Sequence, residues 1–312
     1  MSHPIRILCV LLSWPLATFA ASDGPLAARL AHQPLRASDI RVNVNLTLVP
    51  VSVMDTSGRS VTGLNRDNFR VFDESLPVPI VSFGSQDQPV TVGLIFDCSA
   101  SMRDKFRIAR EAPQQLFQQL NPEDESFLVT VSDKVSLRKS LTSNFEELQS
   151  ALLFVRPDGA TSLVDGIFLA LQNMRKAHNP RKALVIVSDG GDNNSRMTMR
   201  ELEKLAMESD TQIFAANLYQ NPQTREEADG PELLTTLCGR TGGTNFMISD
   251  LPALRSTMGK IGVSLHSQYV IGYNPPESGA SGKYRRIRVE LLLPKGSPTL
   301  RVHARSGYYL PE

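Results

Sequence analysis

The chain has 312 residues, with 33 Lys and Arg against 32 Asp and Glu, which gives a formal net charge of +1. This length exceeds that of a typical single domain and predicts one sizeable core with a smaller satellite. The balanced charge, without a long basic run, argues against nucleic acid as a partner, because phosphate binding requires a strong positive field.

Residues 1–20 have the pattern of a signal peptide. Arg6 precedes an almost wholly apolar run from Ile7 to Leu16, and small residues follow up to Ala20. The apolar run is too short to span a bilayer comfortably, although an uncleaved anchor stays open as an alternative. We therefore expect a secreted, periplasmic or cell-envelope protein without a stable membrane span after cleavage. Residues 21–39 lack periodicity and predict a linker.

Residues 40–86 predict an N-terminal β segment. Apolar residues alternate with polar ones from Val42 to Leu48, and the phase then slips near Pro50. A slip of one residue turns the side chains to the other face, so we expect a bulge or a strand that changes sheets. Further strands are predicted at Phe69–Asp73 and, as an edge strand, at Pro77–Phe83.

Residues 87–265 predict the main domain. Short apolar runs alternate with amphipathic helical segments, which indicates parallel strands joined by helical crossovers. The predicted fold class is therefore α/β, with a doubly wound, mostly parallel, Rossmann-like sheet covered on both faces. The strand at Val92–Phe96 should be central, and Pro113 should kink or divide the helix predicted at 106–120.

Residues 266–312 return to the alternation of β-strands. Ile287–Leu293 and Leu300–Ala304 alternate on either side of a turn at 294–298, which predicts a hairpin. The exposed edges of this hairpin and of the N-terminal β segment would each invite unwanted pairing. We expect the two flanking segments to pack together as one small β module.

Oxygen-bearing side chains follow two of the predicted buried strands. Asp97, Ser99 and Ser101 come after the strand at Val92–Phe96, and Asp189 follows a second apolar run. Open parallel sheets place ligands at the carboxyl ends of their strands, and such oxygen atoms suit a hard cation such as Mg2+. Asp and Ser are also ordinary turn and N-cap residues, so both interpretations stand on these residues alone.

Three segments together resemble the loops of the metal-ion-dependent adhesion site of von Willebrand factor type A domains. They are Asp-Cys-Ser-Ala-Ser at 97–101, Gly-Ala-Thr-Ser-Leu at 159–163 and Ser-Asp-Gly-Gly-Asp at 188–192. The resemblance covers about residues 90–265 and implies the metal ligands Asp97, Ser99, Ser101, Thr161 and Asp189. It implies Mg2+ or Mn2+ as the cofactor, and an unknown protein partner that offers a carboxylate to the metal.

The flanks carry a second resemblance, to secreted bacterial proteins related to von Willebrand factor type A domains. It lies in Val-Pro-Val-Ser-Val at 49–53, Val-Thr-Gly-Leu at 61–64 and the closing Arg-Ser-Gly-Tyr-Tyr at 305–309. The predicted function is an exported, metal-ion-dependent protein-binding module of the adhesion type. The alternative is a structural scaffold of an envelope assembly, in which the metal site is unused or only stabilising.

An enzyme is not expected. The five histidines show neither a catalytic triad nor the spacing of a zinc site, which argues against a metal-assisted hydrolase. Asp192 could support the metal site, although its Gly-Asp-Asn context favours an exposed turn. Cys98 and Cys238 are expected to be free, mostly buried thiols rather than a disulfide.

Overall fold

The computed structural model describes residues 46–84, 88–218, 225–276 and 283–309. The predicted signal peptide, the linker and the beginning of the N-terminal β segment lie outside these residues. Within the described ranges, no helix is both long and apolar enough to cross a membrane.

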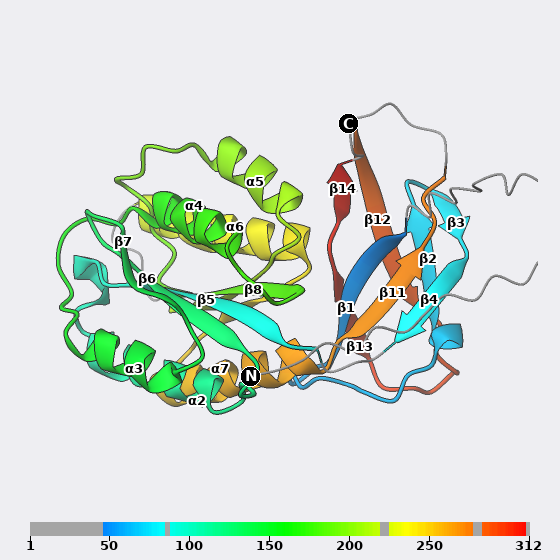
Figure 1. The fold of residues 1–312 in the computed structure, drawn as a ribbon, viewed down its shortest axis with the longest axis horizontal. Helices are drawn as coiled ribbons and strands as arrows, with labels where there is room; N and C mark the ends of the chain where they lie inside the picture. The colour runs from blue at the N-terminus through cyan, green and yellow to red at the C-terminus, as the bar shows by residue number, and fades with distance from the viewer. Residues whose placement is uncertain (1–45, 85–87, 219–224, 277–282, 310–312) are drawn as a thin grey trace, which may run out of the picture. The chain divides into compact units, whose positions relative to one another are not determined.

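A six-stranded sheet occupies the centre of residues 88–268 (Figure 1), in the order β10-β9-β8-β5-β6-β7. Five strands run parallel, and β7 pairs antiparallel at one edge. The predicted α/β fold with a mostly parallel sheet is confirmed. The strands are β5 (Val90–Asp97), β6 (Glu125–Val131), β7 (Ser136–Thr142), β8 (Arg181–Ser188), β9 (Gln212–Asn217) and β10 (Asn245–Met247).

Helices cover both faces of this sheet (Figure 1). One face packs against α1 (Phe106–Ala109), α2 (Pro113–Phe117), α3 (Phe145–Leu153) and α7 (Leu251–His266). The other packs against α4 (Leu163–Met174), α5 (Met199–Glu208) and α6 (Arg225–Thr241). Because helices cover both faces, β5 is buried at every position and is apolar except for Thr91 and the terminal Asp97.

The helix predicted at 106–120 is divided, as expected from Pro113. Pro113 begins α2, where its missing N–H costs no helical hydrogen bond. The first part, α1, begins at Phe106, a few residues after the loop that follows β5.

The order of the strands reverses at β5. From β5 the chain continues to β6 on one side, and later supplies β8 on the other side. In open α/β sheets, ligand sites lie outside the carboxyl ends of the strands at such a reversal. The loops after β5 and β8 therefore flank the expected crevice.

The flanking segments form two four-stranded antiparallel sheets, in the orders β13-β1-β11-β4 and β14-β12-β2-β3. Each sheet contains strands from both flanks, and a third hydrophobic cluster joins the two sheets. The strands are β1 (Thr47–Asp55), β2 (Phe69–Asp73), β3 (Leu76–Val78), β4 (Ile80–Gly84), β11 (Tyr269–Tyr273), β12 (Tyr284–Leu291), β13 (Leu300–Ala304) and β14 (Gly307–Tyr309).

The predicted C-terminal hairpin is wrong. β12 pairs with β2 and β14, whereas β13 pairs with β1 in the other sheet. The turn at 294–298 therefore carries the chain from one sheet to the other. Alternation along a strand reports which face is buried, but it does not identify the neighbouring strand.

Two predictions for the N-terminal β segment also need correction. The single edge strand at 77–83 is divided at Pro79 into β3 and β4, which are edges of different sheets. The ladders of β1 run in regular register from Thr47 to Asp55, so no bulge or change of sheet accompanies the phase slip. Leu48 points outward at 48 % exposure, whereas Val49 and Val51 enter the core.

The strands β4 and β11 are neighbours, with Phe83 opposite Ile271. β4 is the last strand before the six-stranded sheet and β11 is the first after it. The chain therefore leaves the flanking sheets and returns to them at adjacent positions.

Candidate functional site

The first predicted loop begins where β5 ends. Asp97 is the last residue of β5 and is fully buried. Its Oδ1 accepts a hydrogen bond from the backbone N–H of Ser99 at 2.9 Å, which turns the chain sharply out of the sheet. The hydroxyl oxygens of Ser99 and Ser101 lie 3.0 Å apart, with Ser99 buried and Ser101 exposed.

The third loop is tied to the first. Ser188, the last residue of β8, donates its hydroxyl proton to Asp97 Oδ2 at 2.6 Å. The same hydroxyl oxygen accepts a hydrogen bond from Gly190 N–H at 2.9 Å, so it also shapes the turn that carries Asp189. Asp97 and Asp189 therefore lie at the ends of adjacent strands, and the Ser188 hydroxyl is hydrogen bonded both to Asp97 and to the turn that carries Asp189.

The second loop is hydrogen bonded to both of the others. Gly159 O accepts from Ala100 N–H in the first loop at 3.0 Å. Thr161 donates its N–H to Asn193 Oδ1 at 2.9 Å, and its carbonyl accepts from the N–H groups of Asn193 and Asn194. The structure therefore brings all three predicted loops together at the carboxyl edge of the sheet.

A close backbone contact holds the third loop against α6. Gly190 adopts φ +87°, a conformation that favours glycine. A Cβ added to Gly230 of α6 would lie 2.2 Å from Gly190 O, so a side chain at 230 would push the loop away.

The electrostatics of the site suit a cation. Burial, together with the neighbouring charge of Asp189, raises the pKa of Asp97 to about 6, although hydrogen bonds from Ser188 and Ser99 oppose the shift. Asp189 is also buried, and its Oδ1 accepts no hydrogen bond from any described residue. Two close buried carboxylates, one with a buried oxygen that no donor satisfies, would gain from a positive charge.

The donor set decides which cation fits. Carboxylates and hydroxyls are hard oxygen ligands of the kind that Mg2+ and Mn2+ accept, and they lack the nitrogen or sulfur typical of zinc sites. Among the described residues, no three His, Cys, Asp or Glu side chains converge on one point, so the hydroxyls would have to supply part of the coordination. The predicted residues therefore fit a hard divalent cation.

Comparison with known proteins identifies the family of this region. A family model described as the von Willebrand factor type A domain matches residues 92–191. These residues are a von Willebrand factor type A domain. The matched span contains all three loops, and below "the A domain" denotes residues 88–268, which hold the whole six-stranded sheet.

The first of two similar solved structures supports the fold of the chain. A von Willebrand factor type A protein from Catenulispora acidiphila is similar with a TM-score of 0.50 and 13 % identity, over 86 % of this chain and 74 % of that chain. The PilB minor pilin from Streptococcus sanguinis is similar with a TM-score of 0.46 and 14 % identity, over 61 % of this chain and 63 % of that one. At these identities the likeness concerns the fold alone. No curated protein sequence matches the chain.

Three residues that the sequence analysis did not assign to the site take part in it. Ser188 binds Asp97, and Asn193 binds Thr161. Lys105, just before α1, places its Nζ 3.8 Å from Asp189 Oδ2. Ser188 and Asn193 lie beside the third motif and could have been found by proximity, whereas Lys105 carries no recognisable signal.

Asp192 is not the exposed turn residue that its sequence context favours. It is half-buried, and its Oδ2 accepts hydrogen bonds at 2.7 Å from Val164 N–H and from the Ser195 hydroxyl. Val164 lies in the first turn of α4, so Asp192 satisfies one of the free N–H groups there. It fastens the third loop to α4.

Both cysteines of the A domain are free and buried, as predicted. The Cys98 thiol lies 3.1 Å from Val131 O and packs into the core beneath the first loop. Burial, with the nearby charge of Asp97, raises the pKa of Cys98 to about 11. Cys98 is therefore a packing residue and not a ligand.

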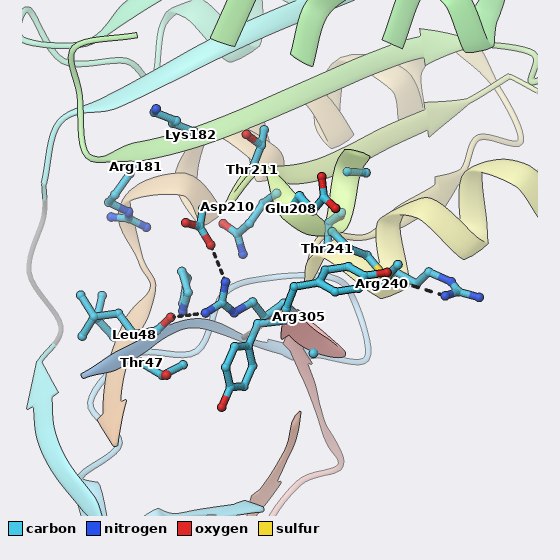
Figure 2. A pocket seen from close by; sticks show the side chains of 18 of the residues that line it. Thr47, Leu48, Arg181, Lys182, Glu208, Asp210, Thr211, Arg240, Thr241 and Arg305 are labelled. Carbon is cyan, nitrogen blue, oxygen red and sulfur yellow. Dashed lines mark hydrogen bonds and ion pairs between the residues drawn. The ribbon is translucent and has the colours of Figure 1, made fainter. Parts of the chain in front are cut away.

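A separate cavity of about 820 Å³ lies at the amino ends of β8 and β9 (Figure 2). Figure 2 shows Arg305 pointing toward Asp210 and toward the carbonyl of Leu48. In the same lining, Lys204 forms an ion pair with Glu208. Both carboxylates of the lining are thus paired with basic side chains, and the lining keeps an excess of Lys and Arg. The carboxyl edge of the sheet, with its unsatisfied carboxylate oxygen, is the stronger candidate.

Proposed function

We propose that the chain is an exported, metal-ion-dependent protein-binding module. Mg2+ or Mn2+ would be held by Asp97, Ser99, Ser101, Thr161 and Asp189, and an acidic group of a partner protein would complete the coordination. The observation that carries the proposal is the buried Oδ1 of Asp189, which has no donor among the described residues. Export rests on the signal-like pattern of residues 1–20.

The residues of the site would have different roles in holding the cation. Asp97 orients the first loop through the N–H of Ser99, while Ser188 holds the Asp97 carboxylate in place. Exposed Ser101 lies at the rim, and buried Ser99 lies below it. The bound cation would supply Lewis acidity toward an anionic oxygen of the partner. Neutral hydroxyls leave more of that acidity available than a wholly carboxylate cage would.

Calorimetric titration of chelator-treated protein with Mg2+ tests the proposal. The wild type should bind, and the Asp97→Ala and Ser101→Ala variants should bind much more weakly or not at all. Ser101 is exposed, so its variant should keep the fold even if loss of the buried Asp97 does not. Asp158→Asn is a matched control, because Asp158 directly precedes the second loop and its side chain is 89 % exposed.

Folded wild-type protein that gives neither heat nor a change in stability with Mg2+ would contradict the proposal. Circular dichroism and thermal unfolding establish the folded state of each variant. The scaffold alternative is separated by pull-down from an envelope extract in Mg2+ and in chelator. Partners of a metal-dependent module should be lost in chelator, whereas partners of a scaffold should remain.

A further inference from the structure

Lys105 places an ammonium group beside the proposed metal site. Its Nζ donates a hydrogen bond to Leu218 O at 2.9 Å, just beyond the end of β9. The same nitrogen lies 3.8 Å from Asp189 Oδ2. The side chains of Lys105 and Asp189 are only 18 % and 8 % exposed, so solvent screens this pair less than a surface pair.

The contact with Leu218 O fixes the position of the charge. A lysine on the surface usually moves among several conformations, which reduces the value of its ion pairs. Here a backbone carbonyl holds the ammonium without neutralising it, because a carbonyl carries no formal charge. The positive charge is therefore directed at Asp189.

The formal charges show the consequence for cation binding. Asp97 and Asp189 contribute −2, and Lys105 contributes +1, so the three groups sum to −1. Without Lys105 the sum would be −2. An incoming Mg2+ therefore meets half of the negative charge that the two carboxylates alone would present, and it is repelled by the ammonium.

We propose that Lys105 is a built-in cation of the A domain, which neutralises Asp189 in the metal-free protein and thereby weakens Mg2+ binding. This inference rests on the proposed function, since it concerns the same site. It explains how two buried carboxylates coexist in the folded, metal-free chain. Lys105 would then determine the Mg2+ concentration at which the site becomes occupied.

The test compares Lys105→Met with Lys295→Met. Methionine keeps most of the length of the lysine stem but removes its charge. Lys295 is exposed in the turn at 294–298, so its variant makes the same change in net charge away from the site. Each protein is treated with chelator and titrated with Mg2+ by calorimetry, and its urea unfolding is measured in chelator.

Lys105→Met should bind Mg2+ about tenfold more tightly than the wild type, while its metal-free form should unfold at lower urea concentration. Lys295→Met should change neither measurement. A purely structural role of Lys105 predicts the loss of stability without the gain in affinity. Unchanged or weaker Mg2+ binding by folded Lys105→Met would overturn the inference while leaving the proposed function standing.

Two further outcomes separate the inference from the proposed function. Binding by Lys105→Met but not by the wild type would support the role of Lys105 and overturn metal-dependent function in the natural protein. Absence of binding by both would overturn both. In an Asp189→Asn background, Lys105→Met should cost much less stability than in the wild type, because the pair is already broken.

Discussion

Asp73 of β2 and Arg285 of β12 form a buried ion pair, with Arg285 Nε donating to Asp73 Oδ1 at 2.6 Å. Asp73 Oδ2 accepts hydrogen bonds from the hydroxyls of Tyr273 and Tyr308, each at 2.9 Å. Tyr273 belongs to the other sheet, so one carboxylate fastens the two sheets together. It also joins strands that precede the A domain to strands that follow it.

Asp73→Ala should lower the free energy of unfolding by about 3–5 kcal/mol, because it leaves a buried guanidinium without its counter-charge. Urea unfolding of the purified variant measures the loss. Glu290→Ala is the control in the same sheet, since Glu290 pairs with Arg288 at the surface and its loss should cost about 0.5 kcal/mol or less. Equal losses in the two variants would contradict this role of Asp73.

The fold of the A domain could largely be predicted from the sequence, because short continuous segments carry the patterns that indicate its strands and helices. β5 ends in Asp97 and β8 is followed directly by Asp189, and both strands are mostly apolar and buried along almost their whole length. Parallel strands expose their carboxyl ends at one edge, so the nearness of the first and third loops followed from the strands that precede them. The second loop lies between α3 and α4, and only the family resemblance placed it beside the other two. The division at Pro113 followed from the missing N–H.

The flanking sheets could not be predicted in the same way, because their pairings join residues far apart in the chain. β12 and β13 alternate like a hairpin, yet β2 and β1 are their partners. Lys105 illustrates the same limit at the site. The role of Lys105 depends on its contacts with Asp189 and Leu218, which are far from it in the sequence and come close to it only in the folded chain.

The contact between Gly230 and Gly190 predicts an unusual cost for a small substitution. Gly230→Ala should destabilise the chain by about 1–3 kcal/mol, because the new Cβ would overlap the Gly190 carbonyl. Gly239→Ala in the same helix is the matched control. No atom lies within 4 Å of its added Cβ, so alanine there should stabilise by about 0.5–1 kcal/mol. Thermal or urea unfolding of both variants checks that the two substitutions change the stability in opposite directions.

His303 predicts a component of pH dependence. Burial, with the nearby charge of Arg301, lowers the pKa of His303 below its ordinary value of 6.5. The unfolded chain therefore takes up this proton first, and the stability contributed by neutral His303 is lost as the pH falls below 6.5. Urea unfolding between pH 7.5 and about pH 5 should show a shallower decline for His303→Gln than for the wild type. Parallel curves would exclude His303 as a source of the decline.

The two thiols of the A domain should be inert in the native state. Burial raises the pKa of Cys98 to about 11 and raises that of Cys238 further, so neither forms the reactive thiolate near neutral pH. In a Cys9→Ser variant, a thiol reagent should label neither residue until denaturant is added. Mass spectrometry of labelled peptides provides the measurement, and rapid native labelling of Cys98 would indicate that the first loop opens.

The adjacency of β4 and β11 has a consequence for how such chains can diversify. Because Phe83 and Ile271 are ladder partners, the chain enters and leaves the A domain through two neighbouring strand ends. A short turn in its place would convert β4 and β11 into an ordinary hairpin, with every other pairing of the two sheets retained. A different domain could therefore be inserted at the same place in the flanking sheets, provided that the contacts of Arg305 and Ser306 with the A domain are replaced.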